Sequence, residues 1–216
     1  MKTTVHSLPL SLLLLLLLPM LAIAARPIEE MPMYGGEHEP TVDRNPGLSK
    51  DAANRGWKLY NEGDLDTAMK RFNQAWMFDR ENAEVYWGFG LVMGQRARKE
   101  DTKKNLEESI RFLKMAVDKD KQNGKILGDL AFSHTIMGYY LESNKEDGKD
   151  NFEKARELYP AAYKLNPEFP PIVANWSVFY FYTKDYDSAR KKADEATKMG
   201  YKFSPDYLQD LESKSK

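Results

Sequence analysis

The chain has 216 residues, with 32 basic and 33 acidic side chains, 12% aromatic residues and no cysteine. This length suits one domain with a sizeable core, and the balanced charge gives no electrostatic reason to expect nucleic acid or an anionic membrane surface as a partner. Without cysteine, disulfides, thiolate nucleophiles and cysteine-ligated metal sites are excluded.

The N-terminus has the features of a cleaved signal peptide. Lys2 supplies a positive charge, residues 8–23 are almost entirely apolar, and Ala22-Ile23-Ala24 has the small-x-small pattern that signal peptidases cut. The alternative is an uncleaved membrane anchor, but an apolar run of about 16 residues is short for a bilayer-spanning helix, which needs roughly 20. We therefore expect residues 1–24 to be removed by a cut after Ala24, with no membrane insertion afterwards.

The expected compartment of the mature protein is periplasmic or extracellular. A secreted chain without cysteine fits a bacterial envelope better than a eukaryotic extracellular setting, where disulfides are common.

Residues 25–48 are predicted to be a flexible linker or a docking arm. Four prolines and the Gly35-Gly36 pair oppose regular structure, and the segment has no helical or strand period. Residues 31–34 (Met-Pro-Met-Tyr) form an apolar island within it. This island either docks along the folded domain or belongs to a mobile tail, and the mobile tail is the preferred interpretation.

The remainder of the chain is periodic. In four places a small residue is followed by a bulky apolar or small residue four positions later and by another small residue seven positions later. The four triplets are Ala68–Phe72–Ala75, Ser109–Leu113–Ala116, Ala155–Tyr159–Ala162 and Ala189–Ala193–Ala196. Their first residues lie 41, 46 and 34 positions apart, which is a 34-residue unit with 7 and 12 extra residues in the first two intervals. Self-similarity at this period indicates stacked helical hairpins.

Gly63 and Asp64 show how one unit is built. Glycine enters the left-handed helix-ending conformation without strain, so Gly63 is expected to end one helix. The Asp64 carboxylate can accept amide protons at the start of the next helix, expected at about residues 66–78. Both helices carry apolar stripes, which are Ala52, Gly56 and Leu59 before the turn and Leu65, Ala68, Phe72 and Ala75 after it.

These spacings resemble the tetratricopeptide repeat (TPR), whose signature places glycine, alanine, an aromatic residue and alanine at the offsets of Gly56, Ala68, Phe72 and Ala75. The pattern continues in the second unit (Tyr86, Phe89, Gly90, Ser109, Leu113, Ala116), the third (Leu127, Leu130, Ala131, Ala155, Tyr159, Ala162, Pro167) and the fourth (Trp176, Ser177, Tyr180, Ala189, Ala193, Ala196). The resemblance covers residues 50–201.

The resemblance implies an all-α fold, a right-handed superhelix of about four TPR-like helical hairpins. We place the solenoid at residues 49–203, with hairpins at about 49–82, 83–123, 124–169 and 170–203. The extra residues, near 96–102 and 139–148, are expected to lengthen turns or helices inside the hairpins. Ser204-Pro205-Asp206 is typical of a helix start, so residues 204–216 are predicted to form a C-terminal capping helix and tail.

The sequence offers little catalytic or metal-binding chemistry. His6 lies in the signal peptide and His38 in the linker, and His134 is expected to be a hydrogen-bonded, partly buried structural histidine. Nucleophile–base pairs therefore lack a partner. Residues 118–124 resemble the start of a calcium loop, but glycine stands seventh (Gly124) instead of sixth, and the twelfth residue is Asp129 instead of glutamate. We interpret this segment as a turn between hairpins and expect no enzymatic activity, metal or cofactor.

The resemblance places the first helix of each hairpin on a concave face, and this face is the candidate binding groove. Its predicted residues are Trp57, Tyr60, Asn61, Trp87, Leu91, Gln95, Phe132, Val178 and Phe181. Aromatic residues dominate interface hot spots, and a groove with more aromatic than charged residues favours an apolar or extended peptide over an acidic peptide tail. The alternative for each residue is packing between adjacent repeats.

The function expected from the sequence is a non-enzymatic scaffold of the bacterial cell envelope that binds a protein or an extended peptide. One alternative is a self-associating structural or assembly factor that uses the apolar island and the aromatic surfaces. A weaker alternative is a carboxylate-dependent hydrolase. Hydrolases built as barrels of helical hairpins exist, but four hairpins are too few to close such a barrel. Neither the partner nor the oligomeric state follows from the sequence.

Overall fold

The computed structural model describes residues 26–36 and 39–214, which form nine α-helices and two short 3-10 helices and contain no strand. The predicted signal peptide at 1–24 lies outside these residues. The α-helices are α1 (Pro46–Glu62), α2 (Leu65–Phe78), α3 (Ala83–Arg96), α4 (Thr102–Lys119), α5 (Gly124–Ser143), α6 (Lys149–Leu165), α7 (Pro170–Tyr182), α8 (Tyr186–Lys198) and α9 (Pro205–Lys214). The all-α fold predicted from the sequence is confirmed.

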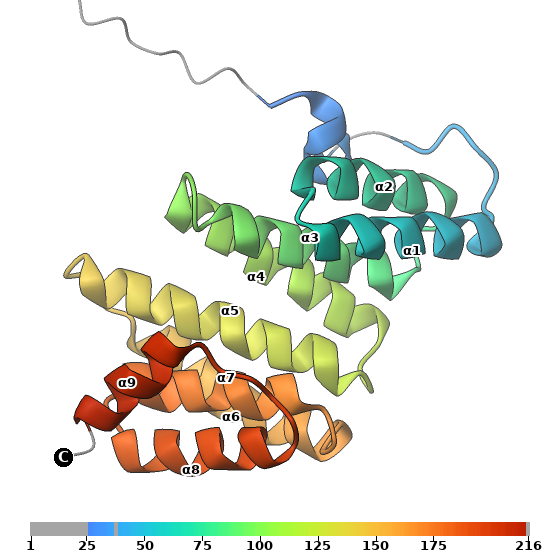
Figure 1. Cartoon of the computed structure of the whole chain (residues 1–216). Coiled ribbons are helices and arrows are strands. Elements are labelled where there is room, and N and C mark those ends of the chain that lie inside the picture. The colour runs from blue at the N-terminus through green and yellow to red at the C-terminus, as the bar shows by residue number, and fades with distance from the viewer. Residues whose placement is uncertain (1–25, 37–38, 215–216) are drawn as a thin grey trace, which may run out of the picture.

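Consecutive helices pair into four hairpins, α1–α2, α3–α4, α5–α6 and α7–α8, and the hairpins stack in chain order (Figure 1). The last helix, α9, lies against the final hairpin, where Leu211 is buried in a cluster with Ala189 and Ala193 of α8. A terminal repeat needs such a cover because its apolar face has no next repeat to contact.

The helix ends follow from capping residues. The Asn45 side chain accepts a hydrogen bond from the Leu48 amide at 3.0 Å and Pro46 occupies the first turn, so α1 begins three residues before the predicted position 49. The first hairpin turns at Gly63, which has a φ of +83°, and the Asp64 carboxylate accepts from the Thr67 amide at 3.0 Å. Here the turn lies where the sequence places it.

The core of the first two hairpins is built around the Phe72 ring, which is fully buried together with Ala68 and Ala75. A Cβ added at Gly56 of α1 would lie 2.7 Å from this ring, and one added at Gly88 of α3 would lie 2.4 Å from it. Contacts this short show that only glycine leaves room for the ring at both positions. Phe72 of α2 therefore fixes the distance between α1 and α3.

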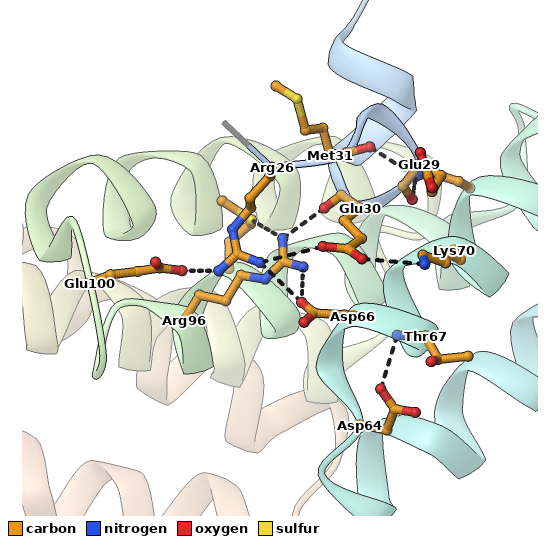
Figure 2. A network of polar contacts seen from close by, with 12 residues as sticks. Arg26, Glu29, Glu30, Met31, Asp64, Asp66, Thr67, Lys70, Arg96 and Glu100 are labelled. Carbon is orange, nitrogen blue, oxygen red and sulfur yellow. Dashed lines mark hydrogen bonds and ion pairs between the residues drawn. The ribbon is translucent and has the colours of Figure 1, made fainter. Parts of the chain in front are cut away.

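The arm formed by residues 26–36 lies against α2 and consists of two 3-10 helices, η1 (Ile28–Glu30) and η2 (Pro32–Gly35) (Figure 2). The fully buried Asn73 amide donates to the backbone oxygens of Glu29 and Met31, at 2.9 and 2.8 Å. The apolar island is thus docked on the first hairpin and does not form the mobile tail that was preferred from the sequence. The sequence shows its apolar side chains but not that a polar residue of α2 bonds to the arm backbone.

Arg96 at the end of α3 holds the same arm and is only 2% exposed. Its guanidinium donates to the Glu30 carbonyl at 2.8 Å and to the Asp66 carboxylate at 2.6 Å (Figure 2). Arg26 forms ion pairs with Asp66 and Glu100 from the other side. A buried charged side chain needs such partners, so the arm is part of the folded structure of the first two hairpins.

Replacing Asn73 with alanine should release the arm. Asn73→Ala removes both bonds to the arm and leaves two backbone carbonyls without their donor, so we expect the free energy of unfolding to fall by about 1–3 kcal/mol. Hydrogen exchange at the Met31 amide, which bonds the Ile28 carbonyl at 3.1 Å, should accelerate. The control is Asn54→Ala at an exposed position of α1. Unchanged exchange at Met31 in Asn73→Ala would contradict this role for the side chain.

Candidate binding groove

A cavity of about 460 Å³ opens between α3 and α5 on the face formed by the first helices of the hairpins. Its position follows from the stacking, because α3 and α5 contact each other less than α1 contacts α3 or α5 contacts α7. Side chains from α1, α3, α4, α5 and α7 and from the turn after α3 line it. This volume lies within the range of about 300–1,000 Å³ that is usual for ligand pockets.

Four of the predicted groove residues meet in this cavity, and they are Tyr60, Leu91, Gln95 and Phe132. The Gln95 amide donates to the Tyr60 hydroxyl at 3.3 Å, which links the first two hairpins across the cavity wall. Leu91 and Phe132 add apolar surface from α3 and α5. The cavity thus presents aliphatic, aromatic and amide groups together.

The two predicted tryptophans lie between hairpins and are not among the residues that line the cavity. Their rings contact each other edge to face, with centroids 4.9 Å apart. The Trp57 indole N–H donates to Glu84 of α3 at 2.5 Å, and the Trp87 indole N–H donates to Asp129 of α5 at 2.8 Å. Each tryptophan therefore ties its own hairpin to the next one, which is the packing role named as the alternative.

The other three predicted residues also lie outside the cavity lining. Asn61 is exposed near the end of α1, and Val178 is half-buried on α7. Phe181 turns toward the C-terminal helix, with its ring centroid 5.6 Å from that of Tyr207. The Tyr207 hydroxyl also lies 2.6 Å from Ser177 Oγ of α7. The fourth hairpin contributes Asn175 to the cavity lining instead.

Asp129 is the main residue of the cavity that the sequence did not single out as a binding residue. Its carboxylate lines the cavity and accepts a hydrogen bond from Trp87. Burial raises the pKa of Asp129 to about 6. Its spacing from Phe132, one helical turn away, was the available signal.

The calcium-loop candidate is a turn, as interpreted from the sequence. Asp120 ends α4, and the Asn123 side chain caps α5 by accepting from the Lys125 amide at 3.2 Å. Within the part of the chain that the structure describes, no group of three or more acidic or histidine residues is arranged to hold a metal ion.

His134 of α5 is hydrogen-bonded, as the sequence predicts, and is more deeply buried than the partial burial expected for it. It is 3% exposed, and its Nδ1 lies 2.8 Å from the Asn151 amide oxygen. Burial lowers the pKa of His134 to about 4, so the ring is neutral near pH 7.

Comparison with known proteins supports the fold and nothing finer. No family model matches the chain, and no curated protein matches it in sequence. Among solved structures it is similar to TTC0263, a thermophilic TPR protein of Thermus thermophilus, with a TM-score of 0.61 and 16% identity over 70% of this chain and 74% of that one. PilF of Pseudomonas aeruginosa aligns with a TM-score of 0.35 and 13% identity over 73% of this chain and 78% of that one, too distant to carry an argument. The protein therefore has a TPR-like fold.

A helix that crosses a bilayer must be both long and apolar. None of the helices among the described residues combines these two properties.

Removing the Asp129 charge should change how stability depends on pH. The native pKa of Asp129, about 6, exceeds the unfolded value of about 3.9, so the native state binds more protons between these values. Its contribution is therefore fully present below pH about 4 and is lost as the pH rises through about 6. Asp129→Asn keeps an acceptor for Trp87, and we expect its free energy of unfolding, relative to wild type, to rise by about 1–3 kcal/mol from pH about 4 to about 7.

Chemical denaturation at both pH values checks this expectation. The lowered pKa of His134 makes both proteins less stable as the pH falls from about 6.5 to about 4, and this effect cancels in the difference between them. Asp194→Asn, at an exposed position of α8, is the matched control. A pH-independent difference between Asp129→Asn and wild type would show that the carboxyl is not perturbed.

Proposed function

We propose that this protein is a non-enzymatic scaffold that binds an extended peptide segment of a protein partner on the face formed by α1, α3, α5 and α7. The observation that carries the proposal is the cavity between α3 and α5, where the apolar side chains of Leu91 and Phe132 lie beside the amides of Gln95 and Asn175. Apolar surface with a few well-placed polar groups is what specific binding sites provide. The TPR-like fold supports this assignment.

A peptide fits this surface better than a compact ligand would. The lining residues come from all four hairpins, from Tyr60 of the first to Asn175 of the last, so the site extends along the stacking direction of the helices. An extended chain carries amide donors and carbonyl acceptors along its length. Gln95, Ser133 and Asn175 can exchange hydrogen bonds with such groups.

The alternatives from the sequence have less support. Met33 and Tyr34 of the apolar island pack against the core of the first hairpins, which removes surface that self-association would use. Among the described residues that line the cavity, Asp129 is the single carboxylate. Hydrolysis by carboxylates uses a pair, so we do not propose that reaction at this site.

Peptide capture tests the proposed surface. Random-sequence peptides would be selected on the mature chain, and the affinity of a selected peptide would be measured by fluorescence polarisation. Phe132→Ala should weaken binding by more than about 1 kcal/mol, as truncation of an aromatic hot spot does. Leu208→Ala, on α9 and 45% exposed, is the control. Thermal melting of both variants separates lost binding from lost folding, and equal affinities in the two variants would refute this site.

We further propose that the scaffold works in the bacterial cell envelope as a secreted member of the TPR proteins. The support is the charged start, apolar run and Ala22-Ile23-Ala24 pattern of residues 1–24. The mature chain is then expected to begin at Ala25, one residue before Arg26 of the arm. N-terminal sequencing of protein purified from an envelope fraction checks this cut, and an intact Met1 in the membrane pellet would instead identify an uncleaved anchor.

A further inference from the structure

We infer that the cavity between α3 and α5 binds a basic side chain, lysine or arginine, of the bound peptide, with the cationic group at Asp129 and the aliphatic stem along the cavity wall. This inference rests on the proposed function, because it assumes that a peptide occupies the groove. It adds the chemical class of the residue that the partner must present.

The first observation is the position of the Asp129 carboxylate. It faces the cavity and accepts one hydrogen bond, from Trp87, and no lysine or arginine of the described chain forms an ion pair with it. A carboxylate removed from water without a cation is costly, and a bound ammonium or guanidinium group would offset that cost through a charge-assisted hydrogen bond. Charge complementarity therefore favours a basic group at this point.

The second observation is the nature of the walls. The cavity is lined by Tyr60, Phe132, Tyr139 and Tyr140, with Leu91 and Ile136 as aliphatic neighbours. Lysine and arginine bury their methylene stems along apolar surface while the charged head stays with a polar partner. Aromatic faces also attract cations. An acidic or purely apolar side chain would use only part of this lining.

Arg98, in the turn after α3, is the one other charged residue among the described lining residues. It is exposed to solvent, so its charge is screened by water and salt more strongly than that of the largely buried Asp129. Repulsion from Arg98 is therefore weaker than attraction to Asp129. The balance still favours a cation deep in the cavity.

The equivalent pair one hairpin earlier provides a matched control. Glu84 accepts from the Trp57 indole N–H just as Asp129 accepts from that of Trp87, but Glu84 is not among the residues that line the cavity. Removing the charge of Glu84 shows what the loss of a tryptophan-bound carboxylate does to binding when the cavity lining is unchanged. Asp129→Asn and Glu84→Gln therefore differ in the one property that the inference uses.

The experiment uses four capped alanine-based peptides that carry lysine, arginine, norleucine or glutamate at their centre. Binding to the full mature chain is followed by NMR at the Trp87 indole N–H, with that of Trp57 as an internal reference. The lysine and arginine peptides should shift the Trp87 resonance and bind at least about tenfold more tightly than the norleucine peptide, a difference of about 1.4 kcal/mol. This preference should vanish in Asp129→Asn and persist in Glu84→Gln.

Each contrary result has a distinct meaning. Equal affinities of the lysine and norleucine peptides for wild type, or a lysine preference that survives in Asp129→Asn, would overturn the cation site and leave peptide binding intact. Absence of binding by all four peptides would also overturn it. The proposed function fails separately, if peptides selected from the random library bind equally well to Phe132→Ala and the Leu208→Ala control.

Discussion

Insertion of a bulky side chain against a glycine of a neighbouring helix is the contact on which this structure depends. Phe72 fills the space left by Gly56 and Gly88, and Ile172 of α7 lies against Gly128 of α5, where an added Cβ would come within 2.8 Å of it. These contacts bring α1 close to α3 and α5 close to α7. The described glycines make no such contact between α3 and α5. The second and third hairpins meet mainly through α4 and α5, where the Ser109 and Ser133 hydroxyls lie 3.0 Å apart. The cavity opens at this junction.

The spacing of the hairpins also determines the position of the Asp129 carboxylate in the groove. Because α3 and α5 are held apart, the Trp87 indole reaches across to Asp129 and fixes one oxygen of its carboxylate. The indole is a donor without charge, so it orients the carboxylate but does not neutralise it. The resulting site combines a largely buried acid, kept in place by a rigid aromatic ring, with open space beside it.

Local packing and part of the cavity lining could be predicted from the sequence, whereas the position of the cavity and the place of Asp129 in it could not. Each hairpin must bury an apolar stripe, and this is why Ala68, Phe72 and Ala75 recur at helical spacing. The sequence of any one repeat is enough to show this pattern. The equivalence of Trp57 and Trp87 was visible too, but not that their indoles would serve the next hairpin. The cavity depends on the distance between two hairpins, which follows from side chains that meet only after stacking, such as Ser109 and Ser133.

The two faces of the molecule differ in how their polar groups are satisfied. On α2 and at the end of α3, Asn73 and Arg96 are buried and bond to the backbone of the protein's own arm. In the groove, Asp129 meets open space beyond the Trp87 bond. A segment of this chain thus already occupies the first surface through backbone hydrogen bonds to buried side chains. The groove presents a second surface of mixed polar and apolar character, and its cavity is lined by a carboxylate that this chain itself leaves without an ion-pair partner among the described residues.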